Sequence, residues 1–314
     1  MKSLGGTPKP ITQQREGCIP MLILISDAFD ATLPNRLRAF GEVTTDTNRL
    51  SEAQVVLVRS KTKCTREYIG QAPNLKVIIR GGVGIDNIDK AHAESKGIVV
   101  RNTPKSSAVA VAELAFSLML STPNNLITYH NGMKQGQWLK NLKRTELYGK
   151  TLCLFGIGNI ARKVAQRAKA FGMRVVAYDK YVEISEDAEM MHNPQEAVRD
   201  ADYISLHLPL TNETQCMVNR DLIAHCLKKP VIINTGRARC VNEDDMVSML
   251  EDGTVSWYCT DVWPTDPPAE DYPILKAERV TLTPHVGANS VENLARIGEE
   301  TYEILEELKK EGVI

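Results

Sequence analysis

The stretch "TLCLFGIGNIARKVAQRAKAFGMRVVAYDK", residues 151–180, predicts a strand, a glycine turn, a helix and a second strand in direct succession. Gly156 and Gly158 permit a tight turn and a close approach of the backbone to a pyrophosphate, and the small Ala161 lets helix and strand pack closely. The first N–H groups of the helix, at Asn159 and Ile160, favour phosphate groups. The stretch therefore predicts a dinucleotide-binding turn, with a purely structural glycine turn as the alternative.

The acid at the end of this unit, Asp179, bears on the choice of dinucleotide. A carboxylate at this place accepts hydrogen bonds from the ribose hydroxyls of the adenosine and repels a 2′-phosphate. We therefore expect NAD rather than NADP as the cofactor. The adjacent Lys180 weakens that preference, because a cation there would attract a 2′-phosphate.

Strand patterns continue on both sides of this unit. Apolar runs before it lie at residues 21–26, 54–60, 75–80 and 97–102, and apolar runs after it at 202–209, 229–235, 255–263 and 279–285. Helical patterns alternate with these runs, and long helices are expected at 108–121 and 291–310. This rhythm predicts an α/β fold with two doubly wound parallel-sheet domains.

The domain limits follow from a break near residues 101–104 and a return near 285. We expect residues 21–101 and 286–314 to form one domain, into which a nucleotide-binding domain of residues 102–285 is inserted. Residues 1–20 precede the first strand pattern and lack the apolar stretch of a signal peptide, so we expect an extension outside the fold.

Composition excludes several classes of protein. Of 314 residues, 43% are hydrophobic and 25% charged, and the net charge of −1 gives no electrostatic reason to expect nucleic-acid binding. There is no run of 18 apolar residues for a membrane span. The 7 cysteines are scattered without a C-x-x-C spacing, so we expect no disulfide framework, no metal site and a reducing, cytoplasmic location.

Polar residues follow three successive strand patterns near the end of the second set. Arg237 follows 229–235, Asp261 and Asp266 lie at the end of 255–263 and beyond, and His285 ends the last run. Because ligands bind at the carboxyl ends of parallel strands, we expect these side chains at one edge. Histidine can shuttle a proton, a carboxylate orients and stabilises it, and an arginine fork holds a carboxylate, which together suit hydride transfer to a 2-oxo acid.

A second glycine-rich loop occurs in "IIRGGVGIDNID", residues 78–89. Gly81, Gly82 and Gly84 follow a strand and expose backbone N–H groups that can cradle an anion. A plain turn between a strand and a helix is the alternative.

The chain resembles the D-isomer-specific 2-hydroxyacid dehydrogenases, and within them the phosphoglycerate dehydrogenase branch. The resemblance spans about residues 54–300 and rests on "VRSKT", "RGGVGIDNID", "GIVVRNTP", "AVAELAFSLML", "TELYGKTLCLFGIGNIARKVAQRAKAFGMRVVAYD", "HLPLTNET", "INTGRA" and "LTPHVGANS". It implies a Rossmann NAD-binding domain inserted in a flavodoxin-like substrate domain. It also implies a homodimer or homotetramer acting on a small 2-hydroxy or 2-oxo acid.

The resemblance also implies roles for particular residues. Arg237 would hold and polarise the substrate, His285 would be the acid/base, and Asp266 falls at its carboxylate partner. Substrate contacts would come from Val83, Gly84 and, for a phosphate group, Arg59. Cofactor contacts would come from Gly156, Gly158, Asn159, Ile160, Asp179, His207, Leu208, Pro209, Thr214, Thr235, Gly236, Asp261 and Gly287. The basic run "LKNLKRTE", residues 139–146, would approach a neighbouring subunit's site, with Trp138 at that interface.

The chain departs from the family pattern at a few places. The family usually has Glu where this chain has Asp266, within "DVWPTDPPAEDYPIL", residues 261–275. Asp is shorter by one methylene, so either the loop sits closer to His285, helped by Pro267 and Pro268, or a water bridges the pair. Gly236 and Ala238 stand where Ala and Gly are usual, and Ser107 where Asn is frequent.

Three readings of function remain at this stage. The first is oxidation of 3-phosphoglycerate to 3-phosphohydroxypyruvate in serine biosynthesis, which Arg59, Lys61 and the basic run at 140–144 favour. The second keeps the chemistry with hydroxypyruvate, glyoxylate or another small 2-oxo acid, and treats those cations as a solvated face. The third is an NAD-sensing binding protein like the corepressors of this fold.

Overall fold

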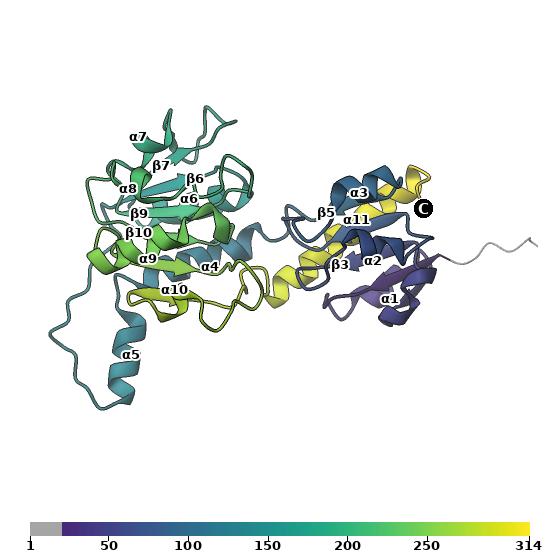
Figure 1. Ribbon diagram of the computed structural model, residues 1–314, viewed down its shortest axis with the longest axis horizontal. Coiled ribbons are helices and arrows are strands. Elements are labelled where there is room, and N and C mark those ends of the chain that lie inside the picture. Colours follow the sequence, from purple (N-terminus) through teal and green to yellow (C-terminus); the bar gives the residue numbers. More distant parts are fainter. Residues whose placement is uncertain (1–20) are drawn as a thin grey trace, which may run out of the picture.

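The first of two parallel sheets lies near both ends of the described chain (Figure 1). The computed structural model describes residues 21–314, and the extension expected at 1–20 lies outside them. The strands are β1 Leu22–Ile25, β2 Glu42–Thr44, β3 Val55–Val58, β4 Val77–Arg80 and β5 Val99–Asn102. All pair in parallel in the order β2-β1-β3-β4-β5, which is the flavodoxin-like order.

Helices cover both faces of this sheet. They are α1 Leu33–Leu37, the 3-10 helix η1 Thr47–Glu52, α2 Arg66–Gly70, α3 Lys90–Ser95 and the C-terminal α11 Val291–Lys310. Because successive strand residues point to opposite faces, Ile78 packs in one core and Ile79 in the other. The second core includes Leu305 and Leu308 of α11, so the end of the chain completes the first domain.

The second sheet has the strand order of a Rossmann fold with one strand added. Its strands are β6 Thr151–Phe155, β7 Arg174–Tyr178, β8 Glu189–Met190, β9 Tyr203–Leu206, β10 Val231–Asn234, β11 Trp257–Thr260 and β12 Val280–Leu282. They pair in parallel in the order β12-β11-β10-β9-β6-β7-β8. The predicted fold class, two doubly wound parallel-sheet domains, is confirmed.

Two sets of helices cover the second sheet. One face carries α4 Ala108–Ser121 and α6 Asn159–Ala170, and the other carries α7 Pro194–Val198, α8 Arg220–Ile223 and α9 Glu243–Asp252. The remaining helices are α5 Leu126–Lys134, the 3-10 helix η2 Ala238–Cys240 and α10 Pro273–Lys276. No helix within residues 21–314 combines the length and apolar character that crossing a membrane requires.

The chain passes between the two sheets twice, between β5 and α4 and between β12 and α11. The start of α11 ties these crossovers together: Asn293 Nδ2 donates to Ala288 O at 2.8 Å and to Ser107 Oγ at 3.3 Å. Arg296 Nε donates to Ser106 O at 3.1 Å. The crossovers lie beside the domain limits expected from the sequence. The assignment of substrate binding to the first domain and of NAD binding to the second stays a prediction.

Some element limits differ from the sequence pattern. The helix α5 ends at Lys134, and Gly136 just beyond it takes a positive φ of 75°. The short strands β2 and β8 were not expected. Both lie at sheet edges, where few residues pair and the apolar alternation is short.

Candidate active site

Arg237 lies on the turn after β10, and the buried side-chain amide of Asn234 fixes the shape of this turn. Asn234, at the end of β10 and fully buried, accepts a hydrogen bond from Gly236 N at 3.1 Å and donates to Arg237 O at 3.0 Å. The guanidinium is held by Gly236 O, which accepts from Nη1 at 2.8 Å, and by Asp86, which accepts from Nε at 2.7 Å. Within residues 21–314 the other N–H groups of this fork have no hydrogen-bond partner, so they can donate to an anionic ligand.

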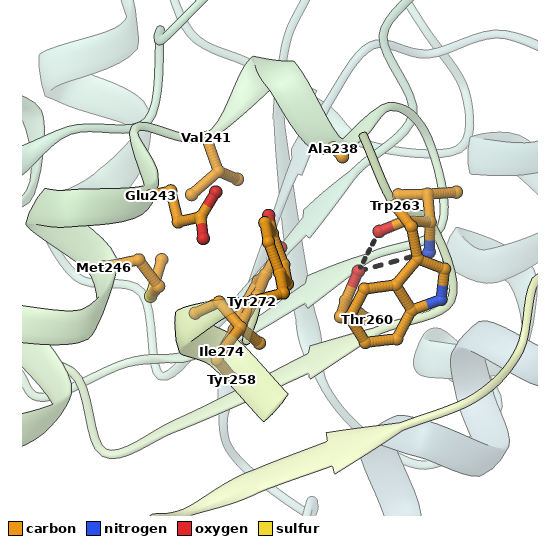
Figure 2. Close-up of a pocket in the computed structure, with 10 residues that line it drawn as sticks. Ala238, Val241, Glu243, Met246, Tyr258, Thr260, Trp263, Tyr272 and Ile274 are labelled. Carbon is orange, nitrogen blue, oxygen red and sulfur yellow. Dashed lines mark hydrogen bonds between the residues drawn. The ribbon is translucent and has the colours of Figure 1, made fainter. Parts of the chain in front are cut away.

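Behind this turn lies a small cavity of about 10 Å³, shown in Figure 2. Glu243, Tyr258 and Tyr272 point into it, with Met246 and Ile274 beside them. Burial raises the pKa of Tyr258 to about 12, and burial is also the main cause of the raised pKa of Glu243. The cavity is too small for an organic substrate, and it shares Ala238, Val262 and Trp263 with the lining of the larger cleft described below.

Asp266 contacts His285 directly. His285 Nδ1 donates to Asp266 Oδ2 at 2.5 Å, so of the two arrangements left open by the sequence the structure has the direct one. His285 follows β12 with a positive φ of 54°, which is unusual for a residue other than glycine and typical of functional sites. The Asp266–Pro267 peptide bond is cis.

The loop that carries Asp266 is tied to the strand end that carries His285. Trp263 Nε1 donates to Thr283 O at 3.0 Å, two residues before the histidine. The Trp263 ring also meets Tyr272 edge-on, with ring centroids 5.9 Å apart. The hydrogen bond from Trp263 to Thr283 O holds the loop of Asp266 close to the segment of His285. The shorter aspartate side chain can therefore reach the imidazole.

The geometry of this pair defines what it can do chemically. An ionised carboxylate only accepts hydrogen bonds, so Nδ1 carries the proton and Nε2 is left to exchange a proton with a ligand. The carboxylate also stabilises the imidazolium that forms when Nε2 is protonated. His285 and Asp266 therefore form a hydrogen-bonded pair whose chemistry suits proton transfer, and their catalytic role stays a prediction.

The glycine loop after β4 approaches Arg237 so closely that a side chain would not fit. A Cβ on Gly84 would lie 1.5 Å from Arg237 Nη2. The loop is fixed by Gly82 N, which donates to Thr103 Oγ1 at 2.7 Å, and by Asn102 Nδ2, which donates to Val83 O at 2.5 Å. Gly84 is thus required for the guanidinium to lie against the loop.

A cleft of about 1100 Å³ brings most of the predicted residues together. It lies between the two domains and is lined by Val83 and Gly84 from one side and by Arg237, Asp266 and His285 from the other. Of the residues expected to bind the cofactor, Ile160, Thr235, Gly236, Asp261 and Gly287 also line it. The catalytic and substrate assignments stay predictions, but these side chains share one cavity.

The nucleotide turn has the backbone that its glycines predict. Gly156 has a φ of 88°, and a Cβ there would lie 2.9 Å from His207 O. Gly158 caps α6, and a Cβ on it would meet no atom within 4 Å, which leaves the helix start open. Asp179 accepts from Ile157 N at 3.0 Å and from Tyr181 N at 2.9 Å, so it closes the turn from the end of β7.

Two buried polar atoms at the cofactor positions have no partner within the described chain. They are Thr235 Oγ1 and His207 Nδ1. Burial lowers the pKa of His207 to about 4, so its ring is neutral at pH 7, and its Nε2 shares a hydrogen bond of 2.9 Å with Ser205 Oγ. A carboxamide or ribose could satisfy such atoms, and together with the open helix start they fit a bound NAD.

The other predicted cofactor residues shape the walls of this region. Thr214 Oγ1 donates to Pro209 O at 2.6 Å and fixes the loop after β9, while a methyl group of Leu208 lies against Gly156. Lys180 forms an exposed ion pair with Glu213 at 2.5 Å, so the carboxylate of Glu213 contacts its amine.

Asp261 holds the second crossover as well as lining the cleft. It is 2% exposed and accepts from Val286 N at 2.8 Å, from Gly287 N at 2.8 Å and from Thr283 Oγ1 at 2.7 Å. The residue predicted beside the cofactor therefore also fixes the segment that follows His285.

Arg59 is not brought into the cleft. Its guanidinium donates to Ala28 O and to Ala288 O, each at 3.2 Å, and bridges the end of the first domain's sheet to the second crossover. Arg80, which the sequence reasoning did not single out, lines the cleft instead. Its Nε has no partner in the part of the chain that the structure describes, and burial, with Arg237 and Arg59 nearby, lowers its pKa to about 10.

Sequence reasoning also missed Asp86 and Asn234. Asp86 stands inside the quoted loop "GGVGIDNID", yet a carboxylate in a turn has many ordinary uses. A signal for Arg80 was present, since an arginine ends the otherwise apolar run "LKVIIR" directly before the glycines.

A Rossmann sheet, a second parallel sheet and a cleft with these residues define a dinucleotide-binding α/β protein of two domains. Residues 116–287 match the family model described as D-isomer specific 2-hydroxyacid dehydrogenase, NAD binding domain. The chain belongs to this family, and NAD is the cofactor that its domain binds.

Relatives and solved structures agree with this assignment. The chain is 39% identical over 283 residues to a D-3-phosphoglycerate dehydrogenase of Methanocaldococcus jannaschii, covering 86% of this chain and 54% of that protein. It is 39% identical over 265 residues to a hydroxypyruvate reductase of Thermotoga maritima, covering 83% and 86%. The chain thus spans about half the length of the first relative and most of the second.

The fold is shared with solved structures at a similar level. A D-lactate dehydrogenase of Aquifex aeolicus, complexed with NAD and lactic acid, has a TM-score of 0.80 and 28% identity, covering 92% of this chain and 95% of that one. A D-isomer specific 2-hydroxyacid dehydrogenase of Polaromonas has a TM-score of 0.83 and 25% identity, covering 93% and 97%.

Proposed function

We propose that this protein is an NAD-dependent dehydrogenase that interconverts a D-2-hydroxy acid and its 2-oxo acid. The observation that carries the proposal is the convergence of Arg237, the His285–Asp266 pair and the Val83–Gly84 loop on one cleft. A binding protein that only senses NAD has no need of a paired imidazole and carboxylate beside a free arginine fork.

The residues of the chain divide the work as follows in the reductive direction. Backbone N–H groups of Val83 and Gly84 hold the substrate carboxylate, and Arg237 holds it beside the loop and polarises the C2 carbonyl. When bound, NADH supplies the hydride to C2. His285 Nε2 gives its proton to the C2 oxygen, and Asp266 keeps the ring oriented and stabilises its charged form.

We further propose 3-phosphoglycerate and 3-phosphohydroxypyruvate as the substrate pair, which would place the enzyme in serine biosynthesis. Arg80 supports this choice, because it lines the cleft and forms no ion pair within residues 21–314. Lys61 and Lys63 line the same wall. Arg80 is thus better placed than Arg59 to meet a phosphate, since carbonyl oxygens already occupy the Arg59 fork.

The second candidate is a reductase for hydroxypyruvate, glyoxylate or another small 2-oxo acid. The relative named hydroxypyruvate reductase supports it, since the alignment covers 86% of that protein. In this case the cations of the cleft wall would serve only as a solvated face.

The deciding experiment compares initial rates of NADH oxidation with phosphohydroxypyruvate, hydroxypyruvate and glyoxylate. We expect kcat/KM to favour the phosphorylated acid by about a hundredfold, or about 2.7 kcal/mol. Arg80→Gln should abolish most of that preference, whereas Arg59→Gln, the matched change of charge, should keep it. Equal rates for all acids would support the second candidate, and no turnover would refute the enzyme reading.

We also propose that the protein is a homodimer. Figure 1 shows α5 and the segment after it projecting from the second domain. Large apolar side chains are exposed along this projection, at Ile127, Met133, Trp138 and Leu142. A second copy of the chain would cover them and would bring the basic run at 140–144 toward a neighbouring cleft.

The described cysteines are all free, which fits the reducing cytoplasm that we propose as the location of the protein.

A further inference from the structure

Asp86 forms a contact that crosses the cleft. Its Oδ2 accepts from Arg237 Nε at 2.7 Å, although Asp86 belongs to the loop after β4 and Arg237 to the turn after β10. Within residues 21–314 this is the one ion pair that joins the two domains; the others lie inside one domain or the other. The pair therefore exists only while the domains face each other across the cleft.

The loop presents Asp86 from a fixed position. The next residue, Asn87, donates from Nδ2 to Arg59 O at 2.7 Å and to Thr62 O at 2.6 Å. A backbone hydrogen bond also encloses Asp86 and Asn87, since Ile88 N donates to Ile85 O at 2.9 Å. Because the backbone around Asp86 is anchored, its carboxylate can hold a partner in place rather than follow it.

The pairing determines which edge of the guanidinium faces the cleft. Nε is taken by Asp86, one N–H of Nη1 by Gly236 O, and Nη2 lies against Gly84. An arginine side chain turns about several bonds, and an anionic ligand can bind any edge of a fork that is not held. Because Asp86 occupies Nε of Arg237, an anionic ligand beside the Val83–Gly84 loop meets the edge of the guanidinium formed by Nη1 and Nη2.

We infer that Asp86 is a positioning residue, which aligns the Arg237 fork for the substrate and does so only when the cleft is closed. The inference rests on the proposed function, in which Arg237 binds the carboxylate and polarises the C2 carbonyl. Asp86 would not touch the substrate itself. It would make the correct arginine geometry depend on the first domain, so that closure of the cleft and alignment of the site occur together.

The test is a double-mutant cycle of Asp86→Ala and Arg237→Lys, with Asp86→Asn as an isosteric variant. A misplaced arginine can cost about a hundredfold in rate. We expect Asp86→Ala to lower kcat/KM for the preferred 2-oxo acid by about that factor, with the NADH dissociation constant unchanged. Asp86→Asn, whose amide oxygen still accepts from Nε, should lose about tenfold. Added to Arg237→Lys, Asp86→Ala should lower kcat/KM less than twofold further, because lysine has no planar fork to align.

Glu189→Gln provides the control, since it removes a carboxylate from an arginine pair of 2.8 Å at the far edge of the second sheet. It should leave kcat/KM unchanged. A cycle in which the two losses multiply would overturn the inference, because Asp86 would then act independently of Arg237. A rise of kcat/KM in Asp86→Ala would also overturn it, by showing that Asp86 competes with the substrate for the fork.

Hydrogen exchange of amides 81–89 adds a readout that needs no turnover. Asp86→Ala and Arg237→Lys should each speed exchange in this loop, and the double variant should exchange no faster than either. If the wild type reduces no 2-oxo acid, the proposed function fails, and exchange alone decides whether the pair couples the domains. Unchanged exchange in both single variants would overturn the pairing even in an active enzyme.

Discussion

At the scale of single residues, Asp266 shows how a departure from a family pattern is compensated. The carboxylate is shorter than the usual glutamate, yet it reaches His285 at 2.5 Å. The hydrogen bond from Trp263 to Thr283 O holds the loop close to the end of β12, which shortens the gap that the side chain must span. The change of residue and the closeness of the loop therefore belong together.

Replacement of Asp266 by Asn should lower kcat by about 10- to 100-fold with little change in KM, because an amide neither stabilises an imidazolium nor fixes the ring tautomer. Steady-state kinetics with the preferred 2-oxo acid measure the effect. Asp271→Asn, an exposed acid of the same loop, is the control and should behave as wild type. An Asp266→Asn enzyme at the wild-type rate would show that the pair has no part in turnover.

At the scale of elements, the turn between β6 and α6 combines two demands on one glycine. Gly156 needs a positive φ, and it also lies too close to the His207 carbonyl for a Cβ. Gly149 has a similar φ of 73°, but nothing lies within 4 Å of a Cβ there. A substitution at Gly149 therefore tests the backbone strain alone, whereas one at Gly156 tests the strain together with the clash between a Cβ and the His207 carbonyl.

We expect Gly149→Ala to cost about 1–2 kcal/mol of unfolding free energy, the strain of a left-handed backbone alone. Gly156→Ala should cost more and should weaken NADH binding at least tenfold, because the strand beside the turn must shift. Urea unfolding and NADH fluorescence titration measure the two effects. Equal NADH affinity in wild type and Gly156→Ala would contradict a cofactor at this turn.

At the scale of the whole molecule, the half-buried His207, whose ring atom Nδ1 is buried, makes the unfolding free energy depend on pH. Its pKa is lowered by burial from 6.5 to about 4, so the folded protein keeps the ring neutral where the unfolded chain protonates it. The unfolding free energy should therefore fall as pH drops from about 6.5 to about 4, by at most about 3 kcal/mol, and this contribution is constant below that range. Above pH 6.5 both states are neutral and the effect vanishes.

Denaturant unfolding at several pH values tests this sign, with His207→Gln as the comparison. The unfolding free energy of the variant should lack the decline that His207 causes. The difference in unfolding free energy between wild type and variant should therefore change between pH 7.5 and pH 4.5. A difference that is the same at both values would contradict a neutral, buried imidazole.

The proposed dimer is tested on its projecting segment. Trp138→Asp, which introduces a charge where a second copy would bury an exposed ring, should halve the mass measured by sedimentation equilibrium. Tyr181→Asp, an equally exposed aromatic at another place in the second domain, is the control and should keep the wild-type mass. A monomeric wild type would refute the dimer directly.

The sequence by itself determined the fold class and the nucleotide turn and singled out Arg237, Asp266 and His285 as candidate site residues, because these depend on local features. Apolar periodicity, glycines at a turn and polar residues after strands act over a few residues, and the helix expected at 108–121 has those limits in the structure. Only the tertiary structure decided which side chains meet: that Asp266 touches His285, that Arg59 binds carbonyl oxygens while Arg80 lines the cleft, and that Asp86 holds Arg237. These contacts join residues far apart in the chain, and their geometry is fixed by how two separately packed sheets face each other.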